Sequence, residues 1–133
     1  MTDTEWRELC EAMADLDTAG RALAAAQQLQ SRVVQDDQGR LMRLLEHELF
    51  TVREAAAWCL SDLGAAHSIP GLLAALKRGA AEGLDNDGLV AAILDLAEVH
   101  PVEVRREAER ILQNGPDGLR EQAQWLVEFM AGL

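Results

Sequence analysis

The chain has 133 residues, of which 49% are hydrophobic and only 4% aromatic, and its formal net charge is −11. This length is typical of one domain, and the excess of acids argues against binding to nucleic acid or to an anionic membrane, which both require basic patches. Alanine-rich segments with few aromatic residues favour helices over strands, so the composition predicts an all-α protein.

The first half of the chain predicts three helices. The first covers 3–17, with apolar residues at spacings of three and four: Trp6, Leu9, Cys10, Met13 and Leu16. Thr18 is the expected N-cap of a second helix that ends near Gln35. Its inward side chains are predicted to be Leu23, Ala26, Leu29 or Gln30, and Val33. After a turn at 36–39, a short third helix ends near Leu49.

The second half predicts five more helices. Thr51 and Glu54 have the spacing of a capping box at the start of a helix over 51–64, and Gly64 is a suitable residue to end it. Further helices are expected from Ser68 to Gly79, from Leu89 to Val99, from Pro101 to about 113, and over 117–130. Eight helices joined by short loops, without any strand pattern, predict an all-α chain.

An internal repeat organises these helices. The segment 52–63 can be laid on 119–130, where Arg, Glu, Ala and Trp coincide and apolar positions remain apolar. The offset of 67 residues is twice a period of about 33, and residues 85–96 fit midway. A fixed period in this range is typical of an α-solenoid.

The segment 44–64, followed by 69–76, resembles the short bacterial HEAT repeats first recognised in bilin-lyase subunits. The resemblance rests on Val52-Arg53, the paired alanines after Glu54, Leu63-Gly64, and Ile69-Pro70 with paired leucines. It departs from the family at Leu49-Phe50, where Asp-Pro is common, and at Asn86, where the middle repeat lacks the arginine.

The resemblance implies one HEAT-like domain over 1–133, an α-solenoid of about four antiparallel helix pairs in a right-handed superhelix. The expected pairs are a divergent pair over 1–38 and successive pairs over 39–64, 68–98 and 101–131. In this family the second helix of each pair lines the concave surface. The resemblance also implies that Arg53 and Arg120 form a structural ladder, each pairing with an acid of the neighbouring repeat.

Acids and two tryptophans are predicted to share the concave surface. On helix 51–64 the apolar stripe formed by Val52, Ala56, Cys59, Leu60 and Leu63 places the other residues on the opposite side. Our candidate partner-binding residues are therefore Glu54, Trp58, Asp62, Asp87, Asp95, Glu121, Trp125 and Glu128. The alternative is that Trp58 and Trp125 are packed between repeats as core, as large aromatic side chains often are.

No catalytic, metal or cofactor site is expected. His47, His67 and His100 lie at expected helix ends, without the spacing of a helical metal site. Cys10 and Cys59 lie in apolar helical patterns, as buried thiols of a reducing cytosol do, so we expect a cytoplasmic protein. No apolar run approaches the roughly 20 residues of a membrane span.

The function that these observations favour is a non-enzymatic module that binds a basic protein partner through the acidic concave face. A small acidic solenoid of bacterial type suggests an immunity or inhibitor protein that neutralises a basic toxin. Two alternatives remain: an accessory or lyase-like subunit that acts on a chromophore-bearing protein, and a structural scaffold.

Overall fold

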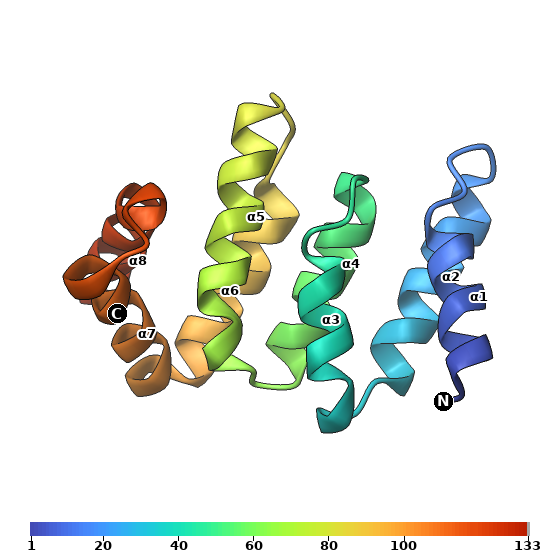
Figure 1. Ribbon diagram of the computed structural model, residues 1–133, viewed down its shortest axis with the longest axis horizontal. Coiled ribbons are helices and arrows are strands. Elements are labelled where there is room, and N and C mark those ends of the chain that lie inside the picture. The colour runs from blue at the N-terminus through green and yellow to red at the C-terminus, as the bar shows by residue number, and fades with distance from the viewer. Residues whose placement is uncertain (133) are drawn as a thin grey trace.

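The computed structural model describes residues 1–132, which form α-helices joined by short turns, with no strand among them (Figure 1). The all-α prediction is confirmed. Short 3-10 turns lead directly into the third, fifth and eighth helices. The helices are α1 (Asp3–Met13), α2 (Ala19–Arg32), α3 (Gln38–Leu44), α4 (Phe50–Asp62), α5 (Ile69–Ala81), α6 (Asp87–Val99), α7 (Pro101–Asn114) and α8 (Arg120–Ala131).

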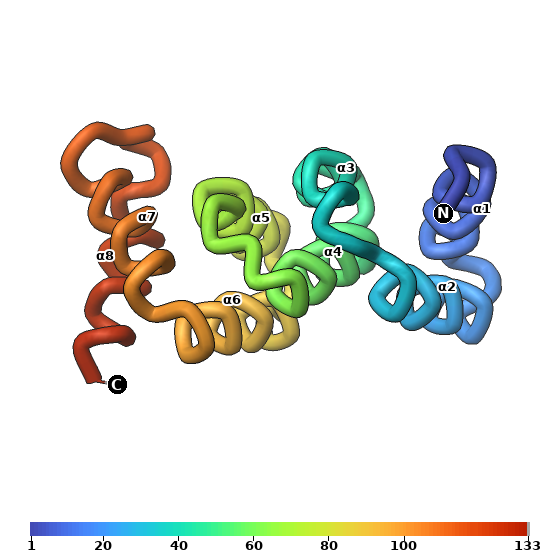
Figure 2. Tube along the Cα trace, turned by 90° about the horizontal axis from the view of Figure 1, so that it is seen from below, coloured from blue at the N-terminus to red at the C-terminus, as the bar shows by residue number. Residues whose placement is uncertain are grey.

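The helices are arranged in two rows along the molecule (Figures 1 and 2). One row holds α1, α3 and α5, and the other holds α2, α4 and α6. Within the second row, α4 packs against both α2 and α6. Figure 2 shows α4 set back between these two neighbours, which makes this inner row concave. The last pair ends the rows differently: α7 packs against α5 and α6, whereas α8 packs chiefly against α7 and α5.

The core is built from leucine, isoleucine and alanine. On α4, the predicted stripe of Val52, Ala56, Cys59 and Leu60 is fully buried, and Leu63 is half-buried at its end. The small alanine side chains allow neighbouring helices to approach, and long aliphatic side chains then fill the space between them. The other large, fully buried hydrophobic residues are Leu29, Leu41, Ile69, Leu72, Leu73, Leu89, Ile93, Leu96, Ile111 and Leu126.

Two leucines that the sequence assigns to the interior are on the surface. The first helix ends at Met13 rather than at Asp17, so Leu16 lies in the following turn and is 68% exposed. Leu23 of α2 is 62% exposed because no element of the described chain covers that side of the helix. Both side chains border the space between α2 and α4.

The predicted capping box at Thr51 and Glu54 is absent. Leu49, with extended backbone, is the N-cap residue of α4, and no side chain of the described residues caps this helix end. Thr51 is therefore already inside the helix, where its side chain cannot serve the first turn. A capping box forms instead at α1, between Thr2 and Glu5, which have the same Thr-x-x-Glu spacing.

Arg53 joins two neighbouring helix pairs from the interior. Its side chain is fully buried and donates hydrogen bonds to the carbonyl oxygens of His47 (2.9 Å) and Glu48 (3.0 Å) and to the carboxylate of Glu82. This ion pair confirms the predicted pairing with an acid of the adjacent repeat. Arg120, at the equivalent position of α8, is instead exposed, because α8 does not continue the inner row.

Candidate functional site

An apolar groove of about 510 Å³ lies between α2 and α4. Six residues of α2 form one wall, five of α4 form the other, and the end of α1 with the following turn closes one side. These residues are Ala19, Ala22, Leu23, Ala26, Gln27 and Gln30 of α2, Phe50, Thr51, Glu54, Ala55 and Trp58 of α4, and Met13, Asp15 and Leu16.

The groove follows from helix packing and from side-chain size. Its lining residues recur every three or four positions on each helix, so each wall is a single helical face. The α2 wall is low because three of its members, Ala19, Ala22 and Ala26, carry only a methyl group. In addition, α2 and α4 pack together less extensively than α4 and α6 do, which leaves space between them.

Both charged residues that line the groove are acids, Asp15 and Glu54. Asp15 pairs with Arg21 at 3.0 Å. The carboxylate of Glu54 has no hydrogen-bond or ion-pair partner within residues 1–132 and is half-buried against α6, where a methyl group on Gly88 would collide with it. Burial, with a smaller contribution from the nearby charge of Asp85, raises the pKa of the Glu54 carboxyl.

Trp58 lies beside Glu54 and is half-buried, with part of its surface against the core and part lining the groove. The sequence left two alternatives for this ring, exposure on the binding surface or packing in the core, and the ring does both in part. An aromatic side chain anchored in this way presents a rigid apolar surface, which is typical of residues that dominate protein interfaces.

The other predicted acids of the inner row do not line the groove. Asp62 of α4 is exposed and accepts a hydrogen bond from Gln30 Nε2 (2.6 Å), which joins the C-terminal ends of the two walls. Asp87 and Asp95 are exposed on α6. These three carboxylates extend the negative charge of Glu54 along α4 and α6.

The residues predicted on the last helix do not join this groove. Glu121, Trp125 and Glu128 line a separate, open depression on α8 together with Asp117, Arg120 and Gln124. Trp125 is half-buried, and Gln124 donates a hydrogen bond to Glu128 (3.1 Å). The expectation that Trp58 and Trp125 share one surface with these acids is therefore wrong, because α8 packs against α5 and α7 instead of extending the inner row.

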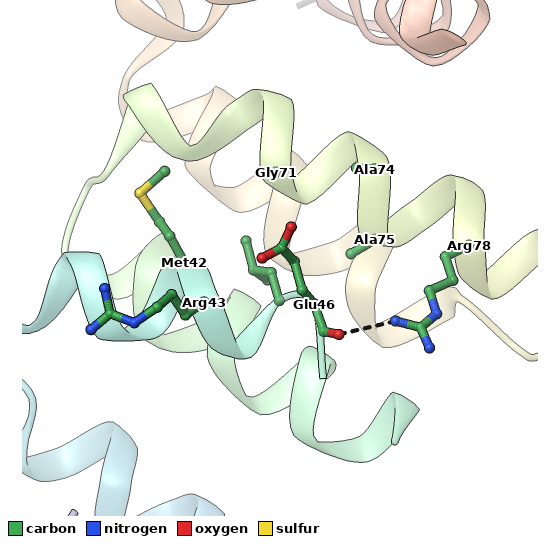
Figure 3. Close-up of a pocket in the computed structure, with 8 residues that line it drawn as sticks. Met42, Arg43, Glu46, Gly71, Ala74, Ala75 and Arg78 are labelled. Carbon is green, nitrogen blue, oxygen red and sulfur yellow. Dashed lines mark hydrogen bonds between the residues drawn. The ribbon is translucent and has the colours of Figure 1, made fainter. Parts of the chain in front are cut away.

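A second groove, of about 490 Å³, lies on the opposite row between α3 and α5 (Figure 3). In Figure 3 the two sides are bridged by a hydrogen bond from Arg78 to the main-chain oxygen of Glu46 (3.1 Å). Sequence analysis identified neither this groove nor the α2 wall of the first one. The two exposed leucines, Leu16 and Leu23, are the features that point to the first groove.

The chemistry available in these surfaces is limited. No cluster of three potential metal ligands occurs among residues 1–132. Cys59 is fully buried, and this burial raises the pKa of its thiol to about 12; burial also raises the pKa of the half-buried Cys10. Neither thiol is thus activated as a nucleophile. In the described part of the chain, no helix combines the length and apolar character needed to cross a membrane.

Comparison with known proteins identifies the central helices. Residues 52–78 match the family model described as PBS lyase HEAT-like repeat, which spans most of α4, the following turn and most of α5. No curated protein and no solved structure matches the chain significantly. The matched segment holds Arg53, Glu54 and Trp58, and a HEAT-like repeat suggests either a protein-interaction module or a lyase-like repeat module. The described chain is therefore all-α, and its segment 52–78 is similar to a HEAT-like repeat.

Proposed function

We propose that this protein is a non-catalytic interaction module that binds a basic protein partner through its inner row of helices. The observation that carries the proposal is the groove between α2 and α4, where the anchored ring of Trp58 lies beside the carboxylate of Glu54, which has no partner among residues 1–132. Buried aromatic anchors supply much of the binding free energy in protein interfaces. No element of the described chain fills this apolar groove. Such a groove is suited to the side chains of a partner protein.

Charge supports a basic partner. The formal net charge is −11, and Glu54, Asp62, Asp87 and Asp95 all lie on α4 and α6. Complementary fields accelerate association and disfavour partners of the same sign. Glu121, Trp125 and Glu128 on α8 form a separate acidic surface, which serves in this proposal as a secondary contact.

One concrete form of this role is an immunity or inhibitor protein for a cationic toxin. An acidic binder blocks such an enzyme by covering the basic groove that receives its substrate. The family description raises a second candidate, a lyase-like accessory subunit. The burial of Cys59 and the raised pKa values of both thiols weigh against any version of that role in which a cysteine attacks a chromophore.

The experiment is affinity capture from a lysate of the source cells at low salt, with quantitative mass spectrometry. The baits are the wild-type chain, Trp58→Ala, Leu23→Glu and Trp125→Ala, each verified as folded by circular dichroism. We expect one basic protein to be held by wild type and by Trp125→Ala and lost by the other two. Leu23→Glu changes an exposed side chain, so its loss of binding is not a folding effect.

The captured partner is then purified and titrated by calorimetry at increasing salt. Binding through complementary charges weakens as salt rises. A partner held equally by all four baits would place the interface away from the inner row. Capture of no partner by the folded wild-type chain, or an affinity that does not respond to salt, would contradict the proposal.

A further inference from the structure

The groove between α2 and α4 has the shape of a docking site for a single helix. Both walls are helical faces, and the α2 wall runs from Ala19 to Gln30. At 1.5 Å per residue these eleven steps span about 16 Å, or roughly three helical turns. Side chains at spacings of three and four form ridges, and the ridges of a third helix fit between them.

The apolar lining favours a helix over an extended peptide. A helix satisfies its backbone hydrogen bonds internally, whereas a strand would place unpaired amide and carbonyl groups against alanine and leucine side chains. The low wall formed by Ala19, Ala22 and Ala26 admits a close helical approach. Leu16 and Leu23, largely exposed in this structure, would be covered by such an occupant.

The acids of the groove indicate which charge the occupant carries. The lining includes Asp15 and Glu54 but no lysine or arginine. Arg21 neutralises Asp15, whereas Glu54 is half-buried without a partner among residues 1–132. Partial burial disfavours the charged form of this carboxyl, and a cation beside it would offset that effect. An incoming lysine or arginine at the edge of an apolar helical stripe would supply that cation.

We propose that the groove binds one amphipathic α-helix of a partner protein, with an apolar face of about three turns against Leu23 and Trp58 and a lysine or arginine paired with Glu54. This inference rests on the proposed function and deepens it by naming the element of the partner that is recognised. The occupant is thus a cationic amphipathic helix rather than a flat basic surface.

The test uses the full chain, labelled with ¹⁵N, and a synthetic helical peptide of about 15 residues. The peptide carries leucines at three- and four-residue spacing, with a lysine at the edge of this stripe. One control peptide has the same composition in scrambled order, and another has glutamine in place of that lysine. Amide chemical shifts locate the binding, and calorimetry measures the affinity of each peptide.

We expect the amphipathic peptide to bind and to perturb amides of α2 and α4, and the scrambled peptide to bind at least about tenfold more weakly because it has no apolar face. Leu23→Glu should abolish binding. Glu54→Gln should lower the affinity for the lysine peptide by roughly three- to tenfold and leave that for the glutamine peptide unchanged. Only an ion pair between Glu54 and the lysine produces that difference.

Several outcomes would overturn the inference. Equal binding of the scrambled peptide, shifts confined to other helices, or an equal effect of Glu54→Gln on both peptides would each do so. So would a dimer of the free chain, seen by sedimentation equilibrium and broken by Leu23→Glu, because the occupant would then be a second copy. A natural partner that is captured by the Leu23→Glu bait but lost by the Trp58→Ala bait would overturn this inference alone and leave binding through the inner row in place.

Discussion

At the scale of single residues, Arg53 shows how a charge is tolerated in the interior. The side chain is fully buried, and its partners are two main-chain carbonyls and the carboxylate of Glu82. Replacing it with methionine removes the donors, so that the Glu48 carbonyl loses its hydrogen bond and the His47 carbonyl keeps only the longer one from Arg78 (3.3 Å). We expect Arg53→Met to lower the free energy of unfolding by about 2–4 kcal/mol, measured by urea denaturation.

Arg120 provides the matched control for this change. It occupies the equivalent position of the repeat on α8 but is exposed, so Arg120→Met should alter stability by no more than about 0.5 kcal/mol. Equal effects of the two substitutions would contradict this difference. They would show that both arginines, or neither, stabilise the fold by joining neighbouring repeats.

Glu54 makes a prediction about pH. Its pKa is raised by burial and then by Asp85, so the folded protein holds the proton more tightly than the unfolded chain. The cost of the charged form is therefore absent below the ordinary pKa of 4.5 and complete once the pH exceeds the raised value. Glu54→Gln should stabilise the protein at neutral pH by on the order of 0.5 kcal/mol, a small gain because the group is partly exposed.

This gain should vanish below about pH 4, since both variants are then neutral at this position. Thermal unfolding at a series of pH values provides the comparison, with Glu121→Gln on α8 as the exposed control. A less stable Glu54→Gln protein at neutral pH would mean that the fold itself holds the carboxylate favourably. Greater stability together with weaker partner binding would instead mark Glu54 as a residue retained for recognition.

At the scale of the helices, Gly79 of α5 allows a neighbouring segment to approach the helix closely. Gly79 of α5 is buried, and a methyl group there would collide with the side chain of Asn86, whose amide donates to the Leu76 carbonyl (3.2 Å). Alanine gains about 1 kcal/mol of helix propensity, but the collision costs more, so Gly79→Ala should be destabilising by about 1 kcal/mol net.

Gly20, in the first turn of α2, tests the propensity effect alone, because a methyl group there meets nothing. Gly20→Ala should raise the free energy of unfolding by about 0.5 kcal/mol. Melting temperatures measured by calorimetry should therefore move in opposite directions for the two variants. A rise for Gly79→Ala would show that Asn86 gives way without loss.

At the scale of the whole molecule, Cys59 reports opening of the central helix. Its thiol is fully buried in α4, which packs against α2, α3, α5 and α6, and burial raises its pKa to about 12. In a Cys10→Ser background, we expect labelling by a thiol reagent only through unfolding, at a rate that rises with urea and with Arg53→Met. Rapid labelling that is independent of urea would indicate local opening of α4.

The sequence by itself determined which segments are helices and how α4 packs. Periodic apolar residues predicted eight helices, the repeat related α4 to α8, and Arg53 was correctly predicted to pair with an acid of the adjacent repeat. The helices and the repeat are local or recur along the chain, so spacing alone reveals them, whereas the pairing of Arg53 was implied by the resemblance to HEAT repeats. Helix ends were harder to predict. Thr-x-x-Glu occurs at the start of both α1 and α4, but it forms a capping box only at Thr2 of α1 and not at Thr51 of α4.

Only the tertiary structure decided which apolar faces stay uncovered. The period of a helix shows which side is apolar, but not whether another helix lies there, so Leu23 was expected inside and is exposed. For the same reason, the matching positions of Trp58 and Trp125 in the repeat did not place them on one surface. Their separation follows from the packing of α8 against α5 and α7. This packing depends on contacts between residues far apart in the chain, which a one-dimensional pattern does not contain.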